Sequence, residues 1–329
     1  MPSSRSAPRI SAVSRAAPDV VTDAPAPAPA PRFSMLRYWL TAIRPRTLLV
    51  AVAPVLVGTA LAWHDLGTLS VLILGVTVLT ALLIQVGTNL HNDVADFERG
   101  ADDPGTRLGP RRATAEGWLR PAQVRRAATL SFATAFFVGL WLAWQGGWPI
   151  LAIGIAAIAC AWSYSGGARP IAYSSLGELF VWLFFGLAAV AGSYYLQAGR
   201  FDGIALAAGA LLGLPAAAVL VVNNYRDMDN DRRAGRRTFA VVFGARASRI
   251  EYGTLMLLPF ALLPLLALSA GPGWLLGLLA LPWAALLVRR FVTSPAGPVF
   301  NTLLADTAKL QLVLGALICA GLFVGGLRG

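Results

Sequence analysis

Residue types that often build polar sites are scarce in this sequence. Its 329 residues include two cysteines, two histidines and one lysine, Lys309. Cys160 and Cys319 both lie in apolar segments and lack the spacing of a disulfide framework or a zinc site, so we interpret them as small core residues. Because lysine is nearly absent, any phosphate group must be held mainly by arginine, whose planar guanidinium binds phosphate through two parallel hydrogen bonds.

Charge is also scarce. Only 13% of the residues are charged and 57% are hydrophobic, with a mean hydropathy of +0.64, whereas a soluble domain carries roughly 25% charged residues. These values predict an integral membrane protein with many spans and the lipid bilayer as a partner. The net charge of +11 does not indicate nucleic acid as a partner, because basic residues of membrane proteins collect in cytoplasmic loops.

Nine apolar segments follow a tail rich in alanine, proline and serine. The tail, residues 1–34, has no apolar run of signal-peptide length and is predicted to be a disordered cytoplasmic extension. Residues 35–329 are predicted to form one transmembrane domain, with spans near 36–63, 68–91, 122–145, 148–164, 174–198, 203–224, 249–270, 273–291 and 303–326.

Arginines alternate along the connections between these segments. The connections after the second, fourth, sixth and eighth segments hold many, whereas the other four hold only Arg200. This asymmetry predicts a cytoplasmic N-terminus and a multi-pass protein of the cell inner (plasma) membrane. The two longest inner connections, about 92–121 and 225–248, are long enough to cap a cavity at the cytoplasmic face.

Two polar stretches with the same spacing end the second and sixth segments. The first spans 89–100 and the second spans 224–235, and at matched positions they carry Asn89 and Asn224, Asn92 and Asp227, Asp96 and Asp231, and Gly100 and Gly235. Offsets of three, four and seven residues share one face of a helix. Each stretch therefore predicts a face of carboxylates and amides at the cytoplasmic side.

Carboxylates at a membrane surface are costly unless they are paired or bind a metal. Mg²⁺ prefers a few carboxylates together with water and the oxygens of a substrate phosphate. We therefore predict a Mg²⁺ site formed by Asp93, Asp96, Asp227 and Asp231, with Asn89, Asn92 and Asn224 as neutral oxygen ligands or supporting donors. The arginines that follow, Arg111, Arg112, Arg236 and Arg237, are candidates to hold the phosphate. In a membrane, the natural diphosphate ester is a polyprenyl one, whose tail would lie among the helices.

The motifs resemble those of the UbiA superfamily of intramembrane prenyltransferases over about residues 37–326. The superfamily motifs are Asn92-Asp93-x-x-Asp96 and Asp227-x-x-x-Asp231. Within the superfamily, the chain is most similar to the branch that acts on 1,4-dihydroxy-2-naphthoate. The motifs that carry this similarity are Arg44-Pro-Arg-Thr47, Gln85-Val-Gly-Thr-Asn89, Gly109-Pro-Arg-Arg112-Ala-Thr114, Gly177-Glu-Leu-Phe180 and Asn223-Asn-x-Arg-Asp227. Arg236 stands where the family often has lysine, which keeps the charge.

The resemblance implies an all-α fold of nine transmembrane helices around a central cavity and a requirement for Mg²⁺. It implies transfer of a polyprenyl group from polyprenyl diphosphate to 1,4-dihydroxy-2-naphthoate, with loss of CO₂ and diphosphate and a demethylmenaquinone as product. Tyr164, Trp162 and Phe184 are candidates to shelter the allylic cation with their aromatic faces, although plain packing also explains such residues.

Two further candidates have open alternatives. Glu178, near the inner end of the fifth segment, is interpreted either as a substrate-binding residue or as a local cap or ion pair. Arg44 would hold either the carboxylate of the acceptor or an anionic lipid.

The residues leave two rival functions open. A prenyltransferase with another acceptor, such as 4-hydroxybenzoate, homogentisate or a sugar phosphate, would need the same diphosphate motifs. A secondary transporter would also combine internal repeats with membrane acids, but its acids would lie near the bilayer midplane and not at one face.

Overall fold

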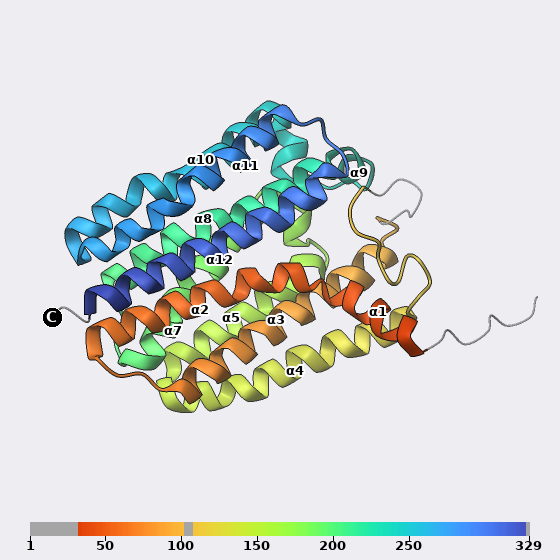
Figure 1. Cartoon of the computed structure of the whole chain (residues 1–329). Coiled ribbons are helices and arrows are strands. Elements are labelled where there is room, and N and C mark those ends of the chain that lie inside the picture. Colours follow the sequence, from red (N-terminus) through yellow and green to blue (C-terminus); the bar gives the residue numbers. More distant parts are fainter. Residues whose placement is uncertain (1–31, 102–107, 327–329) are drawn as a thin grey trace, which may run out of the picture.

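The computed structural model describes residues 32–101 and 108–326, most of which form helices (Figure 1). The predicted tail, residues 1–34, lies almost wholly outside the described residues. In chain order the elements are α1 (Arg32–Ile43), α2 (Pro45–Leu66), α3 (Val71–Glu98), α4 (Pro121–Gly146), α5 (Trp148–Ser165), η1 (Ile171–Tyr173), α6 (Gly177–Trp182), η2 (Leu183–Ala188), α7 (Ala189–Ala198), α8 (Gly203–Arg226), α9 (Met228–Arg233), α10 (Phe239–Ala270), η3 (Pro272–Ala280), α11 (Leu281–Thr293) and α12 (Val299–Gly326).

The prediction of an all-helical membrane protein is confirmed. Within the described ranges, nine helical segments are long and apolar enough to cross a membrane. They are α2, α3, α4, α5, the continuous run from α6 to α7, α8, α10, the run from η3 to α11, and α12. The orientation of the two ends of the bundle stays a prediction.

The first predicted segment, 36–63, is wrong as a single helix. The chain breaks at Arg44, which has a φ of 56° and separates the short helix α1 from the first span, α2. Pro45 explains the break, because proline disfavours helical geometry in the residue before it and is well tolerated at the first position of a new helix. The break directs Arg44 to the wall of a cavity.

The two acidic stretches differ in local structure. Helix α3 continues to Glu98, so the first stretch is helical as predicted. The second stretch is not one helix: α8 ends at Arg226, Asp227 leaves helical geometry, and Asp231 lies on the separate short helix α9. Helix α10 begins at Phe239 but is interrupted at Gly244, whose φ is 81°. That the connections near 92–121 and 225–248 cap the cavity stays a prediction.

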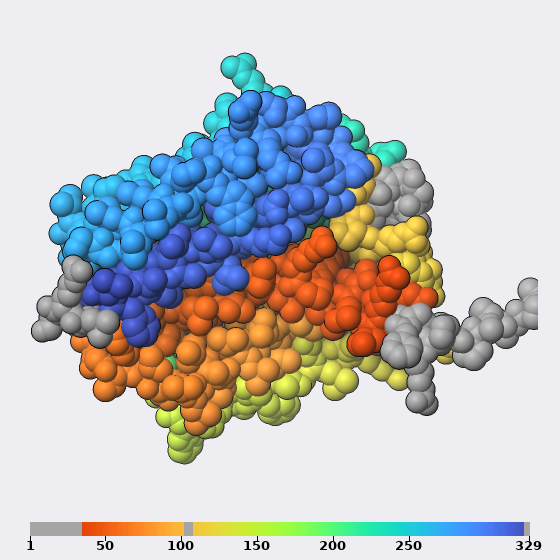
Figure 2. All heavy atoms as spheres, in the orientation of Figure 1, coloured from red at the N-terminus to blue at the C-terminus, as the bar shows by residue number. Residues whose placement is uncertain are grey.

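Helices α2, α8, α10, α11 and α12 form the main packed core. Tyr252 and Phe291 stack there with ring centroids 4.1 Å apart. Figure 2 shows α12, in dark blue, lying against α2, in orange-red, and the two helices make extensive contact. Aromatic side chains such as Trp144 and Trp148 are exposed on the protein surface, as expected of residues that face lipid.

Small residues bring η2 against α8. A Cβ atom added to Gly186 would lie 2.5 Å from the carbonyl oxygen of Gly209, and one added to Gly213 would lie 2.7 Å from that of Trp182. Such close backbone approach is typical of helix pairs in membranes. The η2 segment is a π-helix, a geometry that often occurs at functional sites, and its Phe184 and Phe185 face the cavity.

Candidate active site

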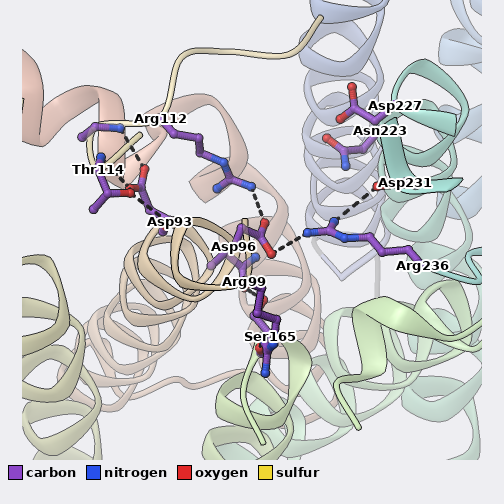
Figure 3. A network of polar contacts seen from close by, with 12 residues as sticks. Asp93, Asp96, Arg99, Arg112, Thr114, Ser165, Asn223, Asp227, Asp231 and Arg236 are labelled. Carbon is purple, nitrogen blue, oxygen red and sulfur yellow. Dashed lines mark hydrogen bonds and ion pairs between the residues drawn. The ribbon is translucent and has the colours of Figure 1, made fainter. Parts of the chain in front are cut away.

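The two acidic stretches meet at one end of the bundle, where α1, α9 and the connection between α3 and α4 also lie (Figure 1). Arg236 joins them. Its guanidinium lies 2.5 Å from Oδ1 of Asp96 on α3 and 3.4 Å from Oδ1 of Asp231 on α9, as Figure 3 shows. All three side chains are at least 85% buried, so the bridge is shielded from solvent.

Arg112 completes this network from the opposite side. Its Nη2 donates a hydrogen bond of 2.9 Å to Oδ2 of Asp96, and both side chains are buried. One carboxylate thus receives two guanidinium groups. Burial pulls the pKa of Arg236 down, but the charges of Asp96 and Asp231 outweigh burial and raise that pKa above its ordinary value. Arg236 is therefore a permanent cation between the two halves of the chain.

Two other predicted phosphate ligands lie elsewhere. The Arg111 side chain is 70% exposed, lies 3.7 Å from Glu116 and passes over the ring of Trp118. Arg237 is also exposed, and its backbone N–H donates to the carbonyl of Tyr173. Neither arginine lines the cavity described below.

Asp93 faces the connection after α3. Its two carboxylate oxygens accept hydrogen bonds of 3.1 and 3.0 Å from the backbone N–H groups of Ala113 and Thr114, and the Thr114 hydroxyl also donates to it. Asp227 is held in another way, since Nε and Nη2 of Arg226 donate to its two oxygens at 2.9 and 2.6 Å. That all four aspartates bind Mg²⁺ stays a prediction.

The predicted amide residues all lie close to this network. Asn89 donates from Nδ2 to the carbonyl of Ile43 and to the Thr47 hydroxyl, which ties α3 to the start of α2. Asn92 accepts a hydrogen bond from Ser165 at the end of α5. Asn224 donates to Oε1 of Glu178 at 2.7 Å. Glu178 is buried behind Asn224 and does not itself line the cavity.

A cavity of about 340 Å³ opens at this network and extends along the bundle. Asn92, Asp96, Arg112, Asn223 and Arg236 line its polar end, together with Arg44, Asn89 and Asn224. Mostly apolar side chains line the remainder as far as Leu142, Ile150 and Leu196, close to the opposite ends of α4, α5 and α7. The polar exceptions along it include Thr77, Thr80, Gln85 and Ser193. The cavity therefore joins a charged site at one end of the bundle to an apolar chamber that is nearly as long as the spans.

Of the three aromatic candidates, two reach the cavity. Tyr164 and Phe184 line it, whereas Trp162 does not. Trp162 is half-exposed and stacks on His91, with ring centroids 5.7 Å apart. Trp162 is therefore not placed to shelter a cation that forms in the cavity.

Several residues that organise the site were not among the predicted site residues. Arg226, Thr114 and Asn223 stand inside the motifs quoted above but received no role. Asn301 on α12 could not be identified from the sequence, because it belongs to no local motif. It accepts a hydrogen bond from Arg226 and donates another to the carbonyl of Leu108.

The oxygen-bearing side chains at the polar end of the cavity can be compared with what a divalent cation requires. No three His, Cys, Asp or Glu side chains in the ranges 32–101 and 108–326 converge to hold a metal by themselves. Mg²⁺ is usually bound through one or two carboxylates, with substrate phosphate and water as the remaining ligands. Asp96 and Asn92 line the cavity, and Asp231 adjoins it because it shares the cavity-lining Arg236 with Asp96, so these residues fit a metal that arrives with a phosphate group.

Comparisons with known proteins agree with this geometry. The chain is 37% identical over 290 residues to a 1,4-dihydroxy-2-naphthoate octaprenyltransferase of Mycobacterium tuberculosis, covering 88% of this chain and 98% of that one. It is 35% identical to the protein of the same name from Escherichia coli, covering 89% and 97%. The fold is shared with a UbiA homolog from Archaeoglobus fulgidus bound to DMAPP and Mg²⁺, at a TM-score of 0.63 and 16% identity, covering 87% of this chain and 99% of that one.

Residues 51–298 match the UbiA prenyltransferase family, which is most of the described part of the chain. The earlier resemblance is thereby confirmed, and the chain belongs to the UbiA prenyltransferase family.

Proposed function

We propose that this enzyme transfers a polyprenyl group from polyprenyl diphosphate to 1,4-dihydroxy-2-naphthoate, with loss of CO₂ and diphosphate, to give a demethylmenaquinol, the reduced form of a demethylmenaquinone. The observation that carries the proposal is the cavity, whose charged end holds Asp96, Arg112 and Arg236 and whose apolar remainder follows the spans. Its shape suits a substrate with one anionic head and a long hydrocarbon tail. The similarity to naphthoate octaprenyltransferases supports the choice of acceptor.

The diphosphate would lie at the polar end of the cavity. Arg112 and Arg236 are the cationic side chains there that already contact Asp96, and both would turn their remaining donors toward phosphate oxygens. Asp96, Asp231 and Asn92 would hold Mg²⁺, which when bound neutralises the charge that develops on the leaving diphosphate. Asp96 is the one of these four aspartates that lines the cavity, and Asp231 shares Arg236 with it, whereas Asp93 and Asp227 contact Thr114 and Arg226. A role of Asp93 and Asp227 as Mg²⁺ ligands therefore has less support.

The reaction would take place just inside the head site. The allylic C–O bond breaks with its electron pair on the diphosphate oxygen, and the electron-rich ring of the acceptor attacks the allylic carbon. Tyr164 and Phe184 line the wall there and would offer their π faces to the positive charge. The apolar wall also excludes water, which would otherwise capture the cation.

Arg44 is our candidate for the carboxylate of the acceptor. It lies at the break between α1 and α2 and lines the polar end of the cavity. Asn89 fixes this break by donating to Ile43 and Thr47 on its two sides. We further propose that this end of the bundle faces the cytoplasm, since most connecting arginines gather there.

The nearest alternative is prenyl transfer to another aromatic acceptor. Membranes containing the chain should be supplied with one polyprenyl diphosphate, Mg²⁺ or a chelator, and 1,4-dihydroxy-2-naphthoate, 4-hydroxybenzoate or homogentisate in turn. We expect a prenylated, decarboxylated naphthoquinol only with the first acceptor and only with Mg²⁺. A product with 4-hydroxybenzoate or homogentisate and none with the naphthoate would contradict the proposal.

A further inference from the structure

The connection after α3 is held from two sides, by Asp93 of the first motif and by Asn301 of α12. Residues 108–120 of this connection lie in the described part of the chain and carry Arg112. Asp93 is 1% exposed and Thr114 is 2% exposed, so the contact between them is sealed from water.

On the first side, Asp93 binds the backbone directly. The Ala113 N–H donates to Oδ2, the Thr114 N–H donates to Oδ1, and the Thr114 hydroxyl lies against both Oδ1 and the Asp93 carbonyl. The carbonyls of Arg112 and Ala113 accept bonds from Glu116 and Trp118, which close the following turn. Asp93 therefore binds N–H groups that the turn itself leaves without a partner.

This anchoring fixes the place of the neighbouring side chain. Asp93 and Asp96 are one turn apart on α3, and the backbone that Asp93 holds begins one residue after Arg112. With that backbone fixed, Arg112 reaches Asp96 at 2.9 Å. Figure 3 shows Thr114 and Asp93 on one side and Arg112 pointing from the same loop toward Asp96.

On the second side, Arg226 reaches the loop through one intermediate, Asn301. Arg226 donates to both oxygens of Asp227 and also to Oδ1 of Asn301 at 2.8 Å. Asn301 in turn donates to the carbonyl of Leu108 at 2.9 Å. The buried Arg226 thus connects the second motif to the far end of the same loop segment, 108–114.

We infer that Asp93, the first aspartate of the first motif, is a positioning residue that clamps the 108–114 segment so that Arg112 lines the cavity, while Asp96, one turn later on α3, faces the ligand. The clamp keeps Arg112 at the polar end of the cavity. The catalytic consequence rests on the proposed function, but the clamp itself does not.

Limited proteolysis tests the clamp without any turnover. Trypsin cleavage of the Arg112–Ala113 bond, identified by mass spectrometry in detergent-solubilised protein, reports release of the segment. Asp93→Asn keeps the side-chain size but leaves one of the two loop N–H groups, that of Ala113 or that of Thr114, facing an N–H donor. Loss of hydrogen bonds to a buried charge should raise cleavage there by about tenfold or more, with cleavage after Arg232 and Arg233 unchanged.

Two threonine variants keep the test decisive if Asp93→Asn does not fold. Thr114→Val removes only the hydroxyl and should also speed cleavage, whereas Thr114→Ser should restore resistance. Thr293→Val is the matched control, because its hydroxyl bonds only the carbonyl of Arg289 in its own helix. Unchanged cleavage in Asp93→Asn and Thr114→Val, or equally faster cleavage at all sites, would overturn the clamp.

The Mg²⁺ dependence of turnover separates the clamp from a metal-ligand role. We expect the Mg²⁺ concentration for half-maximal rate to shift at least tenfold in Asp96→Asn and to stay within about twofold of the wild type in Thr114→Val and Asp93→Asn, whose maximal rates fall. A shift in Asp93→Asn equal to that in Asp96→Asn would show that Asp93 is a metal ligand. If no acceptor is turned over at all, the proposed function fails, and the proteolysis result still decides the clamp.

Discussion

Arg236 and Asp96 form a buried ion pair between residues 140 positions apart, with Nη2 of the arginine 2.5 Å from Oδ1 of the aspartate. The pair joins the connection before α10 to the last turns of α3. Because Arg236 also contacts Asp231, this single guanidinium brings both acidic motifs to one point. The ligand site that we propose is built around that point.

Replacing either carboxylate that Arg236 bridges should strongly reduce catalysis. Asp96→Asn and Asp231→Asn each remove a charge that would face the metal, and we expect a fall in kcat/KM of about 10²-fold or more, typical of lost electrostatic stabilisation. The rate of prenyl transfer in membranes, normalised to inserted protein, measures this. Asp229→Asn is the matched control on α9, because that side chain is 85% exposed, and it should retain activity.

Arg236→Lys should weaken binding of the prenyl donor although charge is kept. A guanidinium reaches Asp96 and Asp231 together, whereas an ammonium is a compact point charge without the planar fork. We expect the KM for polyprenyl diphosphate to rise by about tenfold, equivalent to ~1.4 kcal/mol. Arg232→Lys, at an exposed pair with Asp229, should leave this KM unchanged. Equal KM values for the two variants would argue against the bridge.

Gly213→Ala should destabilise the bundle. The added Cβ would lie 2.7 Å from the Trp182 carbonyl, and the backbone of α6 and η2 would have to move away from α8. Such overpacking costs about 1–3 kcal/mol, which should lower the thermal midpoint in detergent. Gly75→Ala is the control, since a Cβ there meets no atom within 4 Å. An unchanged midpoint in Gly213→Ala would mean that η2 and α8 are not closely packed.

Gly154→Phe should shorten the prenyl groups that the enzyme accepts. Gly154 lines the deep, apolar part of the cavity and has open space where a side chain would start. A phenyl ring there should reduce kcat/KM for a long polyprenyl diphosphate by about tenfold or more through overpacking, and affect geranyl diphosphate little. Ile155→Phe, on the exposed face of α5, is the control. Equal losses for long and short donors would contradict a tail chamber at this place.

The sequence predicted the parts of the fold that depend on local pattern. Nine apolar runs gave nine spans, and the matched spacing of Asp96 and Asp231 placed both near the same end of the bundle. The break at Arg44 was missed because the run of apolar residues continues across it, although Pro45 was the available signal. The end of α8 at Arg226 was missed because the helical spacing of the motif continues through Asp227.

The direction in which individual side chains point could not be predicted from the sequence. Asp93 and Asp96 are both acidic and one turn apart, yet only Asp96 faces the cavity, because the loop at Ala113 and Thr114 returns to cover Asp93. Arg111 and Arg112 are adjacent, and only Arg112 points inward. Asn301 could not be found at all, because its role depends on contacts with Arg226 and Leu108, both remote in sequence.

The most direct measurement is a double-mutant cycle on donor binding. Equilibrium dissociation constants for a polyprenyl diphosphate, with Mg²⁺ and without acceptor, should be measured for the wild type, Asp96→Asn, Asp231→Asn and the double variant. If both carboxylates act on one head group, each single change weakens binding by about tenfold or more and the double variant is hardly weaker than the worse single one. Losses that simply multiply would show that the two aspartates act on separate sites.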